Sequence, residues 1–174
     1  MSFEFYQFAK SRFSVRKFLP DPVLKDDIDE MLKIAHIAPT GCNFQPQKIL
    51  VMNTKESIEK LHECTRSHFG APTAMLVCYD KNECWTRPYD GEKSGLLDAC
   101  IVATHIMLSA HSLGVGVTWV MHFNPDKMRE VFKLPENYVP VALLPMGYPA
   151  PDAEPGPMHD AFRPMEDNVF YDTF

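Results

Sequence analysis

The longest apolar stretch of the chain, Leu96 to Met121, is the feature that most constrains its fold. Asp98, His105 and His111 interrupt this stretch, which indicates a buried helix followed by a strand rather than a membrane span. The helical part is apolar almost all round, so we expect it to be the central core helix. Gly114 is placed to end it.

Four shorter segments have the apolar character of buried strands: residues 48–52, 73–79, 115–120 and 138–146. The last of them contains Pro140 and Pro145, which cannot donate a ladder hydrogen bond, so we expect an edge strand or a bulged strand there. A helix precedes the first strand, because Ile28, Met31 and Ala35 recur at helical spacing. Helices and strands therefore mix along the chain.

The chain has 174 residues, the size of a single domain. We expect one domain over residues 1–150 and an extended arm over residues 151–174. Prolines prevent regular structure in the arm, yet it carries the apolar residues Phe162, Val169, Phe170 and Tyr171. A solvated tail would not need them, so we expect the arm to lie on a second subunit. The alternative is a frayed terminus.

Charge and cysteine content exclude several classes of protein. The net charge is −6, which argues against a nucleic-acid binder, because such a protein needs a basic face for phosphates. The five cysteines include no C-x-x-C pair and no zinc-like spacing, so we expect free thiols, no metal site and a reducing, cytoplasmic location. Residues 1–13 lack the pattern of a secretory signal.

The first candidate site is the segment Arg12-Phe-Ser-Val-Arg16. In an extended chain, alternate residues point the same way, so Arg12, Ser14 and Arg16 would face one point. Two guanidinium groups and a hydroxyl suit a phosphate, because arginine binds phosphate through two parallel hydrogen bonds. The alternative is a solvated basic turn.

The second candidate site is the loop Pro39-Thr-Gly-Cys-Asn-Phe-Gln-Pro46. Asn43 and Gln45 place amide groups beside apolar neighbours, which fits a planar heterocycle with polar edges, such as a flavin or a base. The alternative is a turn whose amides cap the preceding helix.

A third segment, Gly114-Val-Gly-Val-Thr-Trp119, allows a close approach of the backbone to a ligand or a helix. Its glycines follow the predicted helix and precede a strand, so it is not a dinucleotide-binding fingerprint.

Taken in order, these segments resemble the nitroreductase family of FMN-dependent oxidoreductases. The resemblance covers roughly residues 3–171. It rests on Arg12-Phe-Ser-Val-Arg-Lys-Phe18, Ala38-Pro-Thr-Gly-Cys-Asn-Phe-Gln-Pro46, Ser112-Leu-Gly-Val-Gly-Val-Thr-Trp119, Leu134-Pro-Glu-Asn-Tyr-Val-Pro-Val141, Leu144-Pro-Met-Gly-Tyr-Pro149 and Arg163-Pro-Met-Glu166.

The resemblance implies an α+β fold: a three-layer sandwich with a mixed, mainly antiparallel sheet flanked by helices, in an intertwined homodimer. It implies FMN as cofactor and NADH or NADPH as electron donor. The implied reaction is a ping-pong hydride transfer through flavin N5 to nitroaromatics, quinones or other electron-poor small molecules. No single catalytic residue is implied.

The resemblance also implies which residues bind the cofactor. Arg12, Ser14, Arg16 and Arg163 would hold the phosphate end of FMN. From the other subunit, the flavin would be lined by Pro39, Thr40 and Asn43, with Gln45 as a further contact to the ring. The strand backbone near the ring would come from Trp119, Val120 and Met121.

Two departures from the family pattern are visible. Phe13 stands within the cofactor-binding segment where a second arginine is common, so one phosphate contact is missing. The chain is also short, so the segment that covers the flavin would be small and would lie near Trp85–Gly91. Other readings remain open: another flavin reaction on this fold, such as reductive dehalogenation, a flavin-binding sensor or carrier without turnover, and an anion-binding module.

Overall fold

A four-stranded sheet is the middle layer of the structure, a computed structural model that describes residues 2–174. The strands follow the order β1-β2-β4-β3, and every neighbouring pair is antiparallel. The elements are α1 (Ser2–Ser11), α2 (Lys25–His36), η1 (Gly41–Asn43), β1 (Gln47–Met52), α3 (Lys55–His62), β2 (Thr73–Asp80), α4 (Gly95–Ser112), β3 (Gly116–Val117), α5 (Pro125–Phe132), β4 (Tyr138–Gly147) and η2 (Met165–Asp167).

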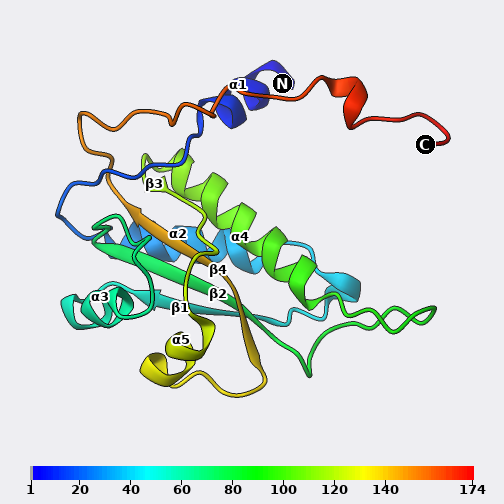
Figure 1. Ribbon diagram of the computed structural model, residues 1–174, viewed down its shortest axis with the longest axis horizontal. Helices are drawn as coiled ribbons and strands as arrows, with labels where there is room; N and C mark the ends of the chain where they lie inside the picture. The colour runs from blue at the N-terminus through cyan, green and yellow to red at the C-terminus, as the bar shows by residue number, and fades with distance from the viewer. Residues whose placement is uncertain (1) are drawn as a thin grey trace.

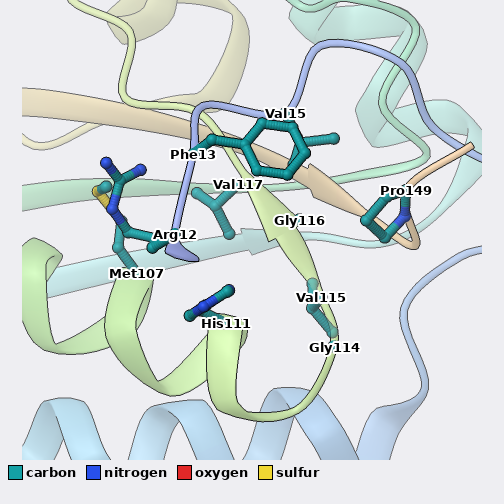
Figure 2. A pocket seen from close by; sticks show the side chains of 10 residues that line it. All are labelled: Arg12, Phe13, Val15, Met107, His111, Gly114, Val115, Gly116, Val117 and Pro149. Atoms are coloured by element: carbon teal, nitrogen blue, oxygen red, sulfur yellow. The ribbon is translucent and has the colours of Figure 1, made fainter. Parts of the chain in front are cut away.

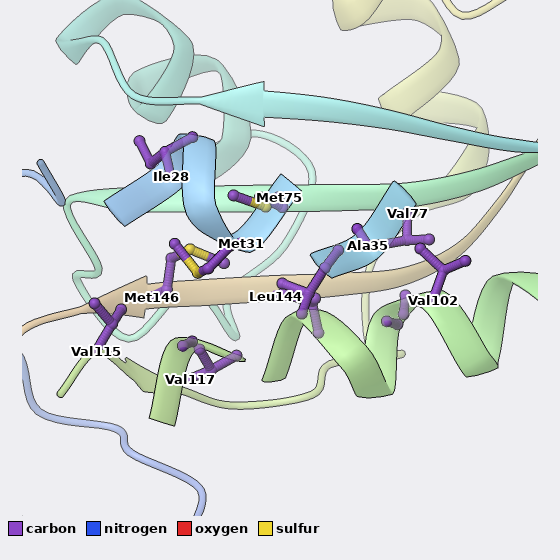
Figure 3. Close-up of a cluster of buried hydrophobic side chains, with 14 of the residues drawn as sticks. Ile28, Met31, Ala35, Met75, Val77, Val102, Val115, Val117, Leu144 and Met146 are labelled. Atoms are coloured by element: carbon purple, nitrogen blue, oxygen red, sulfur yellow. The ribbon is translucent and has the colours of Figure 1, made fainter. Parts of the chain in front are cut away.

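Helices cover both faces of the sheet (Figure 1). Helices α2 and α4 pack on one face, and Figure 3 shows Met31 of α2 and Val102 of α4 beside Met75 and Leu144 of the sheet. Helices α3 and α5 contribute Leu61 and other side chains to a second apolar cluster on the opposite face. The expected three-layer α+β sandwich is confirmed.

Strand β4 is not an edge strand, because it lies between β2 and β3. The predicted bulge is present: Val77 pairs with Ala142 and Cys78 with Pro140, which leaves Val141 without a partner on β2. The prolines are tolerated inside the sheet because β3 pairs with β4 only near its end, so Pro140 has no neighbour on that side.

The predicted strand over residues 115–120 is reduced to β3, a two-residue strand, and an isolated bridge between Val120 and Leu143. Between them, the Thr118 N–H donates to the carbonyl of Pro145 at 3.2 Å. Pro145 has no N–H to return, so the ladder is interrupted at this point. The single parallel contact recorded within residues 2–174 is the isolated bridge from Ser14 to Val117.

Helix α4 begins and ends where expected, and Gly114 follows it with a φ of +73°. The expected core helix is present, but the single chain leaves one face of it uncovered. Leu97 is 64% exposed, and Ile101 also lies on the uncovered face. Within the described chain, α4 alone has the length and hydropathy of a membrane span, and it packs against α2, β2 and β4 as a core helix does.

The arm after β4 has two parts. Residues 149–159 follow the segment 13–19 of the same chain: Phe18 bridges Pro149, and the Lys17 ammonium lies 2.7 Å from the Asp152 carboxylate. Beyond His159 every residue is exposed, and the arm runs past α1 and away from the sheet (Figure 1). Its second part therefore leaves large apolar side chains in water: Phe162, Met165, Val169, Phe170, Tyr171 and Phe174.

Candidate functional site

The segment Arg12–Arg16 is held in an extended conformation against β3. Ser14 bridges Val117, and the Val15 N–H donates to the Val117 carbonyl at 3.2 Å. Val15 is only 3% exposed, because it packs on the backbone of Gly116. A β-carbon at Gly116 would lie 2.8 Å from that of Val15, so this approach requires glycine.

Burial of Val15 turns the alternate residues to the other side. Arg12, Ser14 and Arg16 line one cavity of about 450 Å³, closed on its far side by Gly156–His159 of the arm. The Arg16 Nη1 donates to the Ser14 carbonyl at 3.2 Å, which draws the guanidinium toward the segment. The structure thus brings together the three side chains that the spacing predicted on one face.

This cluster of cations lacks a counter-charge. None of the ion pairs within residues 2–174 involves Arg12 or Arg16. The Arg12 Nη1 is buried without any hydrogen-bond partner. A buried donor without an acceptor is costly, and an anion is the kind of ligand that would supply the missing acceptor.

A smaller pocket of about 200 Å³ lies behind Arg12, between the end of α4 and β3 (Figure 2). Its walls include Met107 and His111 of α4. The His111 Nε2 lies 2.8 Å from the Ser11 hydroxyl. Burial, and then the neighbouring Arg12 charge, lower the pKa of His111, so this imidazole favours its neutral form beside the guanidinium.

Phe13 is not among the residues that line the cavity of the two arginines, but it lines the smaller pocket (Figure 2). Its ring meets that of His159 in an edge-on contact, with 6.4 Å between the centroids. Phe13 therefore fastens the first part of the arm, and it offers no polar group to an anion.

The loop after α2 is fixed by a buried carboxylate. Asp98 of α4, which is 2% exposed, accepts a hydrogen bond from the Gly41 N–H at 2.8 Å and another from the Ser94 hydroxyl at 2.7 Å. Positive φ angles occur at three residues of this loop: Cys42, Asn43 and Gln45. Such angles are unfavourable for residues other than glycine, so the tether to α4 maintains the shape of the loop.

The polar groups of this loop mostly bond one another. The Gln45 N–H donates to the Thr40 hydroxyl at 3.1 Å, and the Gln45 side-chain amide donates to that of Asn43 at 2.9 Å. Pro39 precedes them, and Trp85 of the next exposed segment lies against Gly41. The loop is a preformed, mostly exposed surface.

The two candidate segments lie at opposite ends of α4. The loop is tied to Asp98, whereas Arg12 lies beside His111. A helix rises 1.5 Å per residue, so these two positions are about 20 Å apart along its axis. A single chain therefore does not bring the arginine cluster and the loop together.

Trp119, Val120 and Met121 continue from β3 along the edge of β4. The Val120 N–H donates to the Leu143 carbonyl at 2.8 Å, while Trp119 is half-buried against the core. Met121 is 71% exposed. Arg163 lies on the exposed part of the arm and does not line the cavity of Arg12 and Arg16.

Sequence reasoning missed a broad hollow next to Met121. It has a volume of about 710 Å³ and is lined by residues 62–66 and 122–124. The Thr65 hydroxyl donates to the His122 carbonyl and so joins the two segments. These residues form no motif, and only the fold brings them together.

Comparisons with known proteins agree with this architecture. The family model described as the nitroreductase family matches residues 9–76 and 66–148. A nitroreductase family protein from Clostridium difficile 630 has a solved structure that is 41% identical, with a TM-score of 0.90, over 97% of this chain and 98% of that one.

Two further proteins are similar over most of their length. A relative from Methanothermobacter thermautotrophicus, named as an NADH dehydrogenase/NAD(P)H nitroreductase, is 30% identical over 89% of this chain and 81% of its own. An FMN-dependent nitroreductase from Clostridium difficile R20291 is 26% identical, with a TM-score of 0.78, over 96% and 98% of the two chains. On the extent of the family match and these likenesses, this chain belongs to the nitroreductase family.

Proposed function

We propose that the chain binds FMN between the arginine cluster of one subunit and the loop Thr40–Gln45 of another, and reduces electron-poor small molecules with electrons from NAD(P)H. The general activity follows from the relatives: the chain is an NAD(P)H-dependent flavin oxidoreductase, with FMN and NAD(P)H as its cofactor and electron donor. The specific acceptors and the site residues are the proposal.

One observation carries the assignment of the phosphate site. The buried Arg12 Nη1 has no partner, and Arg12 lines the same cavity as Ser14 and Arg16. Two unneutralised guanidinium groups and a hydroxyl match the phosphate end of FMN, because charge-assisted hydrogen bonds to phosphate are strong. Arg163 of the arm would complete this site in the assembled protein.

The remaining residues would position the ring and exclude water from one side of it. The hydride chemistry is supplied by FMN when it is bound. The backbone of Trp119–Met121 would line one edge, and the exposed Met121 would contact the ring. Pro39, Thr40 and Asn43 would close the site from the second subunit, and Gln45 would hold Asn43 in place. The open side would receive the donor and the acceptor in turn.

A homodimer accounts for three features at once. The arginine cluster and the loop lie too far apart in one chain, one face of α4 is uncovered, and the arm ends in exposed aromatic side chains. Burial of these apolar surfaces by a second copy would stabilise the assembly by about 25 cal/mol per Å². We expect the active protein to be a dimer in the cytoplasm, with residues 151–174 wrapped around its partner.

The test begins with the purified protein. We expect a yellow protein with the absorbance of oxidised flavin, which bleaches when NADH or NADPH is added without oxygen. Addition of menadione or a nitroaromatic compound should restore the colour and sustain turnover. Bound flavin that stays oxidised with both donors would contradict the reductase and favour a flavin-binding sensor or carrier. A colourless protein that FMN does not stabilise would favour an anion-binding module.

A further inference from the structure

Phe69 lies against one of the two arginines of the proposed phosphate site. The Arg16 guanidinium carbon is 5.8 Å from the centroid of the Phe69 ring, within the range of a cation–π interaction. Phe69 belongs to the segment between α3 and β2, and Arg16 to the segment between α1 and α2. The fold therefore brings an aromatic ring to a cation that has no acidic partner.

The backbone at Phe69 is strained. Phe69 has a φ of +54° and Gly70 a φ of +67°, and the Ala71 N–H donates to the His68 carbonyl at 3.0 Å. Positive φ at both central residues is the pattern of a type I′ turn, which favours glycine and asparagine. A phenylalanine at the first of these positions is unusual, and strain of this kind is typical of ligand sites.

A side-chain hydrogen bond holds the turn in this shape. The Gly70 N–H donates to the His68 Nδ1 at 3.0 Å, which requires that nitrogen to carry no proton. The His68 ring also stacks on that of His62, with 3.8 Å between the centroids. Phe69 itself packs on the apolar cluster of α3 and α5. The turn thus fixes the backbone that carries the ring, and the apolar cluster supports the ring itself.

We propose that Phe69 is a positioning residue that holds the Arg16 guanidinium in place to bind the phosphate of FMN. The inference rests on the proposed function. Arg16 is exposed, and in the described chain its one hydrogen bond is to the Ser14 carbonyl. A free arginine of this kind samples many rotamers, and ordering it on binding would reduce affinity.

An aromatic ring is suited to this task in a way that a carboxylate is not. A carboxylate would fix the guanidinium but would also neutralise it and occupy its N–H groups. The face of a ring attracts the cation and leaves its charge and its edge N–H groups available. Phe69 therefore orders Arg16 without competing with the phosphate.

The experiment compares FMN with riboflavin, which has the same ring but no phosphate. Phe69→Leu keeps an apolar side chain in the cluster and removes the aromatic face. We expect it to weaken FMN binding about 2- to 5-fold and to leave riboflavin binding unchanged. Phe69→Tyr should restore FMN affinity. The matched control is Phe132→Leu, which alters a ring that packs on the same cluster without touching Arg16.

A double-mutant cycle tests the link to Arg16 directly. In an Arg16→Gln background, Phe69→Leu should cause no further loss of FMN affinity, because the cation is already absent. Equal losses for FMN and riboflavin, or losses that add in the double variant, would overturn the proposal and indicate a merely structural role. If the wild-type protein bound neither ligand, the proposed function would fail first and this inference with it.

Discussion

The two ends of α4 carry the two halves of the proposed FMN site. At the C-terminal end of α4, Arg12 lies beside His111 and has a hydrogen-bond donor without a partner. At the N-terminal end, Asp98 holds the loop Thr40–Gln45, whose polar groups mostly bond one another. One end needs a ligand, and the other is already shaped to contact one. In the proposed dimer, each chain prepares both halves of a site in positions where they cannot meet, and assembly of two chains joins them.

The largest expected effect concerns the end that is already shaped. Asp98→Ala would leave the Gly41 N–H and the Ser94 hydroxyl without their acceptor. Each buried polar group left unpaired costs about 1–3 kcal/mol, so for these two groups we expect the free energy of unfolding to fall by about 2–6 kcal/mol. Chemical denaturation measures this. Asp21→Ala, at an exposed aspartate, is the control, and an equal fall in both variants would refute the role of the tether.

The next effect concerns the end that needs a ligand. Arg12→Gln should weaken FMN binding by about 10- to 100-fold, because a charge-assisted hydrogen bond is lost. Fluorescence titration of the apoprotein measures this loss. Unfolding of the apoprotein should change little, since the Arg12 Nη1 has no partner there.

Mixed dimers of Arg12→Gln with Asp98→Ala then test whether the halves come from different subunits. If they do, one of the two sites is fully wild-type, and we expect half of the normal tightly bound FMN. If each site lies within one chain, every site carries a defect and no tight binding returns. The second result would break the comparison between the two ends.

A smaller effect is expected where the arginine segment meets β3. Gly116→Ala would place a carbon within 2.8 Å of the Val15 side chain, so the segment must move. Overpacking of this kind typically costs about 1–3 kcal/mol, and the shift should also reduce FMN affinity. Thermal unfolding and FMN titration check both. Gly156→Ala, where the added carbon makes only ordinary contacts, should leave stability unchanged.

The smallest effect is a dependence of stability on pH. Burial, and then the nearby His62, lower the pKa of His68 from its usual 6.5. A histidine whose pKa is lower in the folded state binds fewer protons there, so stability is full above about pH 6.5 and falls as the pH drops below it. His111 contributes in the same direction.

The variant His68→Asn isolates this contribution. Its side-chain oxygen can still accept from the Gly70 N–H, yet it does not titrate. Denaturation midpoints between pH 5 and 8 should therefore fall less steeply with acid than in the wild type. An unchanged slope would exclude His68 as the titrating group.

Local patterns predicted most of the architecture. The apolar run that ends at Gly114 gave the bounds of α4 to within one residue, and alternation placed Arg12, Ser14 and Arg16 on one side. These features depend on neighbours in sequence. The order of the motifs along the chain also predicted the family correctly.

What the sequence did not reveal depends on contacts between distant residues. Nothing near Phe69 indicates that its ring meets Arg16. Pro140 and Pro145 allowed either an edge strand or a bulged strand, and they could not show that β4 is an inner strand with a bulge. The uncovered face of α4 was missed for the same reason, since an apolar side chain looks alike in sequence whether its own chain or another covers it. The proposed roles of the site residues stay predictions.

The end of the arm has a practical consequence. Six large apolar side chains beyond His159 face water in the single chain, and hydration of such groups is unfavourable. In dilute preparations, in which chains seldom meet, these side chains would stay exposed to water, and the protein would tend to adhere to vessel walls. We therefore expect protein to be lost from solution at low concentration, and removal of residues 160–174 should reduce this loss.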